Sequence, residues 1–281
     1  MRKKKKITVS TFLFMALVLI GLGVLFYPTL SDLYTRYQIS RELRQYNEVL
    51  EADKADYSAL WKEAEEYNRS LAGKANHLFA GRDEYELTYK MLNPNDSSML
   101  GYIEIPAINI ELPIYRGTEE KQLQSGAGWW VGSSLPTGGD STHCIITAHT
   151  GLAKAKLFTD LDRLKEGDRF TITVLDRTMS YEVDQILVTD PDDMEPLQVV
   201  EGEDYVTLYT CTPYGVNTHR LLVRGHRTAS EEKAVPTQQE TSDRTWMIAI
   251  PVCVLFVVLI LWLIRRNRKK RREHLKDLER R

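Results

Sequence analysis

A cysteine and an arginine nine positions apart flank a turn-like stretch in "TLYTCTPYGVNTHRLLVRG". Cys211 ends a β-rich run and Arg220 opens the next one, so a turn between adjacent strands would place them side by side. A thiol attacks carbonyls as the thiolate, and a fixed cation stabilises the negative charge that builds on the carbonyl oxygen. The pair therefore suggests acyl transfer through a thioester. Taken alone, it is also typical of a structural Arg that pairs with an acidic residue.

A reactive thiol needs a base, and histidine is the usual partner, placed through space rather than along the chain. The candidates between the two apolar runs described below are His77, His143, His149, His219 and His226. We favour His149 because it ends the run "THCIITAH" and precedes a Gly turn, so it lies at a strand mouth as Cys211 does.

Side-chain alternation separates the two cysteines of this part of the chain. If 142–149 is a regular strand, His149 lies on one face and Cys144 on the other. Cys144 is therefore expected to be a buried apolar filler rather than a nucleophile. The same alternation points His219 away from Arg220.

Two apolar runs without a charged residue, 7–27 and 246–264, flank these candidates. Each is close to the roughly 20 residues that cross a bilayer as a helix. Basic clusters lie on their outer sides: residues 1–6 hold five Lys or Arg, and 265–281 hold ten against three acidic residues. The positive-inside bias then places both termini in the cytoplasm and 28–245 outside.

The first run has a second interpretation, a cleaved signal peptide, because a basic start and an apolar core are typical of one. Its length, and the lack of a small-x-small pattern in "LFYPTLSD", favour an uncleaved anchor. The basic tail directly follows an apolar run, which is more typical of a stop-transfer segment that contacts anionic lipid than of a nucleic-acid site.

Cysteine usage fits an exported domain with a reactive thiol. The chain has three cysteines, and Cys253 falls inside the second apolar run, where it is expected to be a small apolar residue. Cys144 and Cys211 could form one disulfide, whereas a small disulfide scaffold would contain more cysteines. An unpaired thiol in an exported domain suggests reactivity.

The elements that must position these side chains are mostly short strands. Residues 31–72 carry apolar and aromatic residues at helical spacing, which predicts a stalk or packing helix, whereas 73–98 are mixed and polar. From Met99 onwards, seven or eight β-rich runs over about 130 residues predict an all-β barrel or sandwich. The segment "GLAKAKLFTDLDRLK" is the one predicted helical insertion, and 229–245 reads as a polar linker.

Three motifs carry a resemblance to a known family. "TLYTC" resembles the Thr-Leu-x-Thr-Cys signature of the sortases, membrane-anchored transpeptidases of Gram-positive bacteria. "TAHTGL" resembles the segment that holds their catalytic His, and Arg220 falls where their Arg falls. "TCTPYGVNTHRLLVRG" and a C-terminal second span are similar to class C, the pilin-polymerising subgroup, and the likeness is dense over about residues 90–227.

The resemblance implies a mainly β fold: a sortase-type closed β-barrel with N-terminal helices, flanked by two transmembrane helices. It divides the chain into a cytoplasmic basic N-terminus (1–6), a signal-anchor helix (7–27), an extracellular helical and lid-like region (28–98), the catalytic barrel (99–228), a linker (229–245), a transmembrane helix (246–264) and a basic cytoplasmic tail (265–281).

The resemblance also assigns roles. Cys211 is the nucleophile that cleaves a Leu-Pro-x-Thr-Gly-like sorting signal between Thr and Gly, and His149 is the acid/base. Arg220 stabilises the oxyanion and the signal backbone, and Thr210 lines the substrate groove beside the thiol. The implied partners are pilin subunits with C-terminal sorting signals and acceptor lysines, together with membrane lipid. No metal, cofactor or nucleic acid is implied.

The sequence departs from the class C pattern at two places. Class C members carry a lid with an Asp-Pro-aromatic motif, and "KANHLFAGRDEYELTYKMLNPND" contains no Asp-Pro, so the lid is expected to be absent or rebuilt. Ala148 and Thr150 stand where Gly and Arg are expected, which changes the rim of the site. Two alternatives stay open: a sortase that anchors proteins to peptidoglycan, and a non-enzymatic assembly scaffold, which would predict a missing catalytic residue.

Overall fold

A computed structural model of the chain describes residues 9–53, 55–71, 73, 78, 81–152 and 154–228. The predicted linker (229–245), second span (246–264) and basic tail (265–281) lie outside these residues, as does the N-terminal basic cluster. The structural statements that follow concern the described residues.

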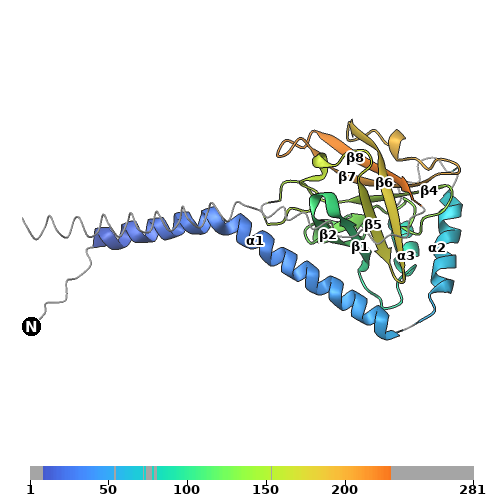
Figure 1. Cartoon of the computed structure of the whole chain (residues 1–281), viewed down its shortest axis with the longest axis horizontal. Coiled ribbons are helices and arrows are strands. Elements are labelled where there is room, and N and C mark those ends of the chain that lie inside the picture. Colours follow the sequence, from blue (N-terminus) through green and yellow to red (C-terminus); the bar gives the residue numbers. More distant parts are fainter. Residues whose placement is uncertain are drawn as a thin grey trace, which may run out of the picture. The chain divides into compact units, whose positions relative to one another are not determined.

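Eight strands in this part of the chain close into a barrel (Figure 1). They are β1 (Met99–Ile105), β2 (Ile110–Arg116), β3 (Ala127–Trp129), β4 (Thr142–Thr147), β5 (Arg169–Val174), β6 (Arg177–Thr189), β7 (Asp204–Thr212) and β8 (His219–Arg227). Around the barrel they follow the order β1-β2-β3-β4-β7-β8-β6-β5. The pairs β2–β3 and β4–β7 are parallel and the others antiparallel. Closure leaves no exposed sheet edge, and it confirms the predicted closed barrel.

Strands β4, β7 and β8 are covered on both faces. Their inward side chains, such as Cys144, Leu208 and Val223, belong to the main hydrophobic core. Their outward side chains form a second cluster, which we call the outer cluster: Ile145, Tyr209 and Leu222, packed with Leu78 and Leu197. Every residue of β4 is therefore buried, as expected for a strand with parallel pairing that is covered on two sides.

The helical structure predicted over 31–72 is confirmed, but it forms two helices, α1 (Val9–Asp53) and α2 (Ser58–Leu71), instead of one. The second helix has its own start signal, because the Asp56 side chain accepts a hydrogen bond from the Ser58 backbone N–H at 2.9 Å. Hydrogen bonds from Ser58 also lower the pKa of Asp56.

The predicted helical insertion was also wrong. Among its described residues, "GLAKAKLFTDLDRLK" forms turns and one short 3₁₀ helix, η3 (Leu161–Arg163). Gly151 has φ +76° and Leu157 has φ +43°, and these left-handed conformations interrupt an α-helix. Two further 3₁₀ helices lie elsewhere, η2 (Pro106–Ile108) and η4 (Glu195–Leu197).

Helix α3 (Arg82–Tyr89) lies within the region 28–98 that was predicted to be helical and lid-like, whereas the four-residue α4 (Glu120–Leu123) was missed. The α3 end is tied to the barrel by Arg116, whose Nη2 donates to Leu92 O at 2.9 Å and whose Nη1 donates to Thr88 O at 3.4 Å. Burial lowers the pKa of Arg116 to about 10, and neighbouring tyrosines oppose that shift. A buried cation near the last carbonyls of a helix stabilises that end.

Helix α1 joins an apolar N-terminal part to the barrel. The stretch Ala16–Ala52 contains a window that is long and apolar enough, by length and composition, to cross a membrane, which suggests membrane anchoring near the N-terminus. Further along, Ile39 and Leu43 are buried against the barrel. The Tyr46 hydroxyl donates to Leu100 O at 3.2 Å and accepts from Leu175 N at 2.9 Å, and burial raises its pKa to about 12.

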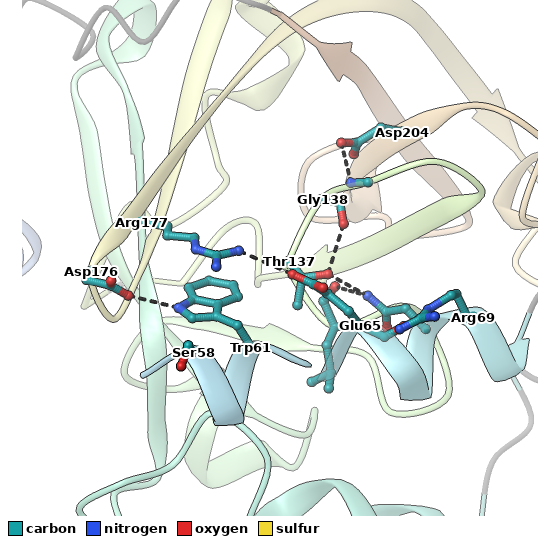
Figure 2. Close-up of polar contacts among 12 residues, drawn as sticks. Ser58, Trp61, Glu65, Arg69, Thr137, Gly138, Asp176, Arg177 and Asp204 are labelled. Carbon is teal, nitrogen blue, oxygen red and sulfur yellow. Dashed lines mark hydrogen bonds and ion pairs between the residues drawn. The ribbon is translucent and has the colours of Figure 1, made fainter. Parts of the chain in front are cut away.

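The first half of α2 docks through a tryptophan. Trp61 is almost fully buried, and its indole Nε1 donates to Asp176 Oδ1 at 2.8 Å (Figure 2). The Arg177 guanidinium lies over the same ring, with Cζ 4.3 Å from the centroid, and pairs with Glu65 at 3.2 Å. Both barrel residues lie at the β5–β6 turn, so this contact holds α2 to that corner.

The second half of α2 docks through Asn68, which is buried. Its amide donates to Leu135 O at 2.9 Å and to Thr137 Oγ1 at 2.8 Å, and its carbonyl accepts from Leu135 N at 2.7 Å. The expected packing role of this helical region is therefore confirmed for α2.

Asn68→Leu leaves the buried N–H and C=O of Leu135 without their side-chain partners. We expect the free energy of unfolding to fall by about 1–3 kcal/mol for each of these unpaired groups. Glu63→Gln on the exposed face of α2 is the matched control and should stay within about 0.5 kcal/mol of wild type. Urea unfolding of detergent-solubilised protein measures both. Equal losses in the two variants would show that the Asn68 contacts do not stabilise the fold.

Candidate active site

The thiol of Cys211 and the guanidinium of Arg220 belong to directly opposed residues. The antiparallel register of β7 and β8 pairs Cys211 with Arg220 and Thr212 with His219. Side chains opposed in this way have Cβ atoms roughly 4.5–5.5 Å apart. Cys211 is a free, half-buried cysteine. The prediction that a turn brings residues 211 and 220 side by side is thus confirmed.

Arg220 is held by the turn and by β7. Its Nη1 donates to Asn217 O at 3.1 Å and to His219 O at 3.0 Å. Burial raises the pKa of Tyr209, and the neighbouring Arg220 opposes that shift by its charge and a hydrogen bond. Because Tyr209 lies two positions before Cys211 on the same face of β7, it helps hold the guanidinium on that face.

His149 follows the end of β4, beside the end of β7. The parallel register pairs Thr147 with Tyr209, and Ala148 N then donates to Tyr209 O at 3.3 Å. Continuing this register brings His149 to the level of Cys211. The structure therefore gathers Cys211, His149 and Arg220 at one end of three adjacent strands.

Thr210, which was expected to line the substrate groove, forms a buried hydrogen bond between two strand ends. It is almost fully buried, and its hydroxyl donates to Ala148 O at 2.7 Å. The bond joins the residue before Cys211 to the residue before His149. The hydroxyl therefore fixes the two strand ends against each other instead of facing the groove.

Glu120 is a member of the site that sequence reasoning missed. Its Oε2 lies 3.2 Å from His149 Nε2, across 29 positions of sequence. Its other carboxylate oxygen accepts a hydrogen bond from Gln124, and the bonds from Gln124 and His149 lower the pKa of Glu120. The sequence signal, an acidic pair in "TEE", does not distinguish this residue from any other exposed glutamate.

The segment after His149 is fastened at several points. Phe158 N donates to His149 O at 3.1 Å, and Gly151 N donates to Thr159 Oγ1 at 3.0 Å. A Cβ at Gly151 would lie 3.3 Å from the ring of Tyr214 in the β7–β8 turn. The turn after His149 and the β7–β8 turn therefore lie close together beside the site.

Helix α1 fastens the same segment from the other side. Asp32 Oδ1 accepts a hydrogen bond from Lys156 N at 3.0 Å, and Thr35 Oγ1 donates to Lys154 O at 3.1 Å. Both contacts link residues more than a hundred positions apart. The backbone that follows His149 is thus held directly by the helix that contains the apolar N-terminal stretch.

The other cysteine and histidines lie elsewhere. Cys144 is buried in the core, and burial raises the pKa of its thiol well above the usual value, which confirms its role as a filler. His143 is buried, with Nδ1 2.8 Å from Gln198 O and Nε2 2.7 Å from Thr207 Oγ1. His219 lies 3.7 Å from Asp190, His226 lies near the far end of β8, and His77 is outside the described residues.

Leu78 lies in the region where a lid was expected to be absent or rebuilt. It is one of the described residues of 73–98, and it is buried in the outer cluster against Tyr209 and Leu222. Trp130 Nε1 donates to Leu78 O at 3.1 Å, and the Trp130 and Tyr209 rings meet edge to face at 5.3 Å. Part of this region therefore packs on the strands of the site even though it contains no Asp-Pro.

Comparison with known proteins identifies the family. Residues 103–228 match the sortase domain. The crystal structure of sortase C1 from Streptococcus agalactiae is 46% identical, covers 68% of this chain and all of that chain, and superposes with a TM-score of 0.64. The chain belongs to the sortase family. The resemblance drawn from the sequence motifs is confirmed.

Other sortases extend the comparison. The crystal structure of Streptococcus pneumoniae sortase C is 44% identical, covering 68% of this chain and 97% of that chain, with a TM-score of 0.60. Sortase A of Streptococcus agalactiae serotype III (strain NEM316) is 26% identical over 79% of this chain and 88% of its own length. This sortase is a cysteine transpeptidase, and the similar solved structures include class C enzymes.

The exposures of the two described cysteines predict selective labelling. Iodoacetamide should alkylate Cys211 in the native protein and leave Cys144 unmodified, because a buried thiol with a raised pKa is neither accessible nor ionised. Peptide mass spectrometry reads both sites. Labelling in urea is the control, and it should modify Cys144 as well. Alkylation of both thiols at equal rates in native protein would contradict the assignment.

Proposed function

We propose that this sortase is a pilin polymerase that cleaves a Leu-Pro-x-Thr-Gly-like sorting signal between Thr and Gly and joins the pilin to a lysine of the next subunit. The supporting observation is the 40–46% identity to several sortase C structures over most of their length. One of these, S. pneumoniae sortase C, is described with pilin substrate specificity, and another is sortase C1 of a pilus island.

In the first half-reaction, the Cys211 sulfur attacks the Thr carbonyl carbon. The carbonyl oxygen takes up negative charge, and Arg220, directly opposite the thiol, stabilises it. The C–N bond to Gly then breaks, and His149 gives a proton to the leaving amine. The product is a thioester between Cys211 and the Thr carbonyl.

In the second half-reaction, the amine of an acceptor lysine attacks the thioester. His149 accepts a proton from the incoming nitrogen, the C–S bond breaks, and the Cys211 thiolate is restored. The new bond is a Thr–Lys isopeptide. Thr210 supports both steps by fixing the strand ends that carry Cys211 and His149.

The proposed setting is the cell membrane, with the barrel outside and both termini in the cytoplasm. The apolar part of α1 supports the first crossing. The uncharged run 246–264 and the basic segments 1–6 and 265–281 support a second crossing and contact with anionic lipid, by sequence alone.

The second candidate function is the anchoring of surface proteins to peptidoglycan. It is supported by the relatives named sortase A. Their identity to this chain is lower, 21–31% for the sortase A relatives against 40–46% for the sortase C structures. A non-enzymatic scaffold is disfavoured because Cys211, His149 and Arg220 meet at one end of the barrel.

The proposal is tested by incubating the protein with a candidate pilin and acceptor. Wild type should produce SDS-resistant ladders with Thr–Lys crosslinks by mass spectrometry, Cys211→Ala should produce none, and Cys144→Ala should retain them. A thioester at Cys211 without ladders would instead support an anchoring sortase that needs a cell-wall amine. Neither product would argue against the proposed activity.

Replacing Arg220 should separate its charge from its geometry. Arg220→Ala should lower kcat/KM for cleavage of a Leu-Pro-x-Thr-Gly peptide by about 10²–10³, the loss typical when an oxyanion donor is removed. Arg220→Lys keeps the positive charge but lacks the planar guanidinium, so its kcat/KM should lie between those of wild type and Arg220→Ala. The exposed Arg163→Ala is the control. The cleavage rates are measured by chromatography of the peptide products. Equal rates in Arg220→Ala and the control would exclude a role of Arg220 in stabilising the oxyanion.

A further inference from the structure

The contact between Glu120 and His149 defines the state of the imidazole. A carboxylate only accepts hydrogen bonds, so the 3.2 Å contact places a proton on His149 Nε2. Nδ1 is then the ring nitrogen available to exchange a proton with the thiol or with a substrate amine. Sequence reasoning assigned the acid/base to His149 but gave no reason for a particular ring nitrogen.

Glu120 is the first residue of α4, which packs against β3. A Cβ at Gly128 in β3 would clash with Gly117 O and would lie 3.1 Å from Leu123 Cδ2, so α4 and the chain before it pack closely on that strand. Within α4, Gln124 donates to the second oxygen of Glu120. The carboxylate is thus oriented from one side by Gln124 and from the other by His149.

The charges around His149 favour such a partner. Arg220 faces Cys211 on β8, and Lys154, in the same loop as His149, acts on Glu120 by its charge. His149 must carry a second ring proton to protonate the leaving amine, and a carboxylate at its other ring nitrogen stabilises the positive charge that results. Glu120 supplies such a carboxylate at hydrogen-bond distance from His149.

We propose that Glu120 is a positioning residue of the transpeptidase, which holds the Nε2–H of His149, directs Nδ1 toward the reacting atoms and stabilises the imidazolium. The inference rests on the proposed roles of Cys211 and His149. The side chain of Glu120 is 68% exposed and that of His149 is 29% exposed, so the contribution is that of an exposed ion pair rather than a buried triad.

The test is the pH dependence of Cys211 alkylation by iodoacetamide in the full-length, detergent-solubilised protein. Glu120→Gln should slow alkylation near pH 7 by about two- to fivefold, the range for an exposed pair, and the rate should recover at higher pH. Without the carboxylate, less imidazolium is available to pair with the thiolate. High salt should narrow the difference between the variant and wild type.

Glu119→Gln is the matched control, because it removes the same charge one position away, and it should keep the wild-type profile. Cleavage of a Leu-Pro-x-Thr-Gly peptide provides the second readout. In Glu120→Gln, the limb that falls as the imidazolium is lost should move to lower pH.

Overlapping profiles for Glu120→Gln and Glu119→Gln would overturn the inference. A lower rate with an unchanged pH dependence would overturn it too, because that result indicates only a structural role. Alkylation requires neither pilin nor acceptor. A wild-type enzyme that is alkylated as expected but forms no ladders would therefore count against the proposed function and not against this inference.

Discussion

The pairing of β7 with β4 on one side and β8 on the other is the constraint on which the site depends. Neither pairing could slip by one residue without turning Cys211 from the outer face into the core. Burial on both faces prevents such a slip, because the outer cluster and the barrel core each require their own set of side chains. The hydrogen bond from Thr210 to Ala148 locks the same register at the strand ends.

The placements that the structure confirms are those set by local chain geometry. Cys211 and Arg220 are joined by one turn, and alternation along a single strand was enough to assign Cys144 to the core. The place of His149 beside Cys211 follows from the meeting of two strand ends in a small barrel. The fold class followed from the spacing of short β-rich runs, and the motifs narrowed it to one family.

The residues that were missed depend on contacts far along the chain or on local signals overridden by packing. Glu120 meets His149 only because a four-residue helix rests on β3, and no pattern in the sequence indicates that placement. The loop after His149 has helical composition, but its shape follows from bonds to Asp32 and Thr35 of α1. The break before α2 was marked by a single Asp cap, which the strong periodicity on either side obscured.

The clamp made by α1 also sets the distance along the helix between its apolar part and the active-site loop. Asp32 and Thr35 follow the end of the apolar run at Tyr27 by five and eight positions, about 8 and 12 Å of helical rise. The loop after His149 is therefore attached to α1 only about one to two helical turns beyond the apolar run. Adding whole helical turns between Tyr27 and Asp32 would lengthen that separation in steps of about 5 Å along the helix.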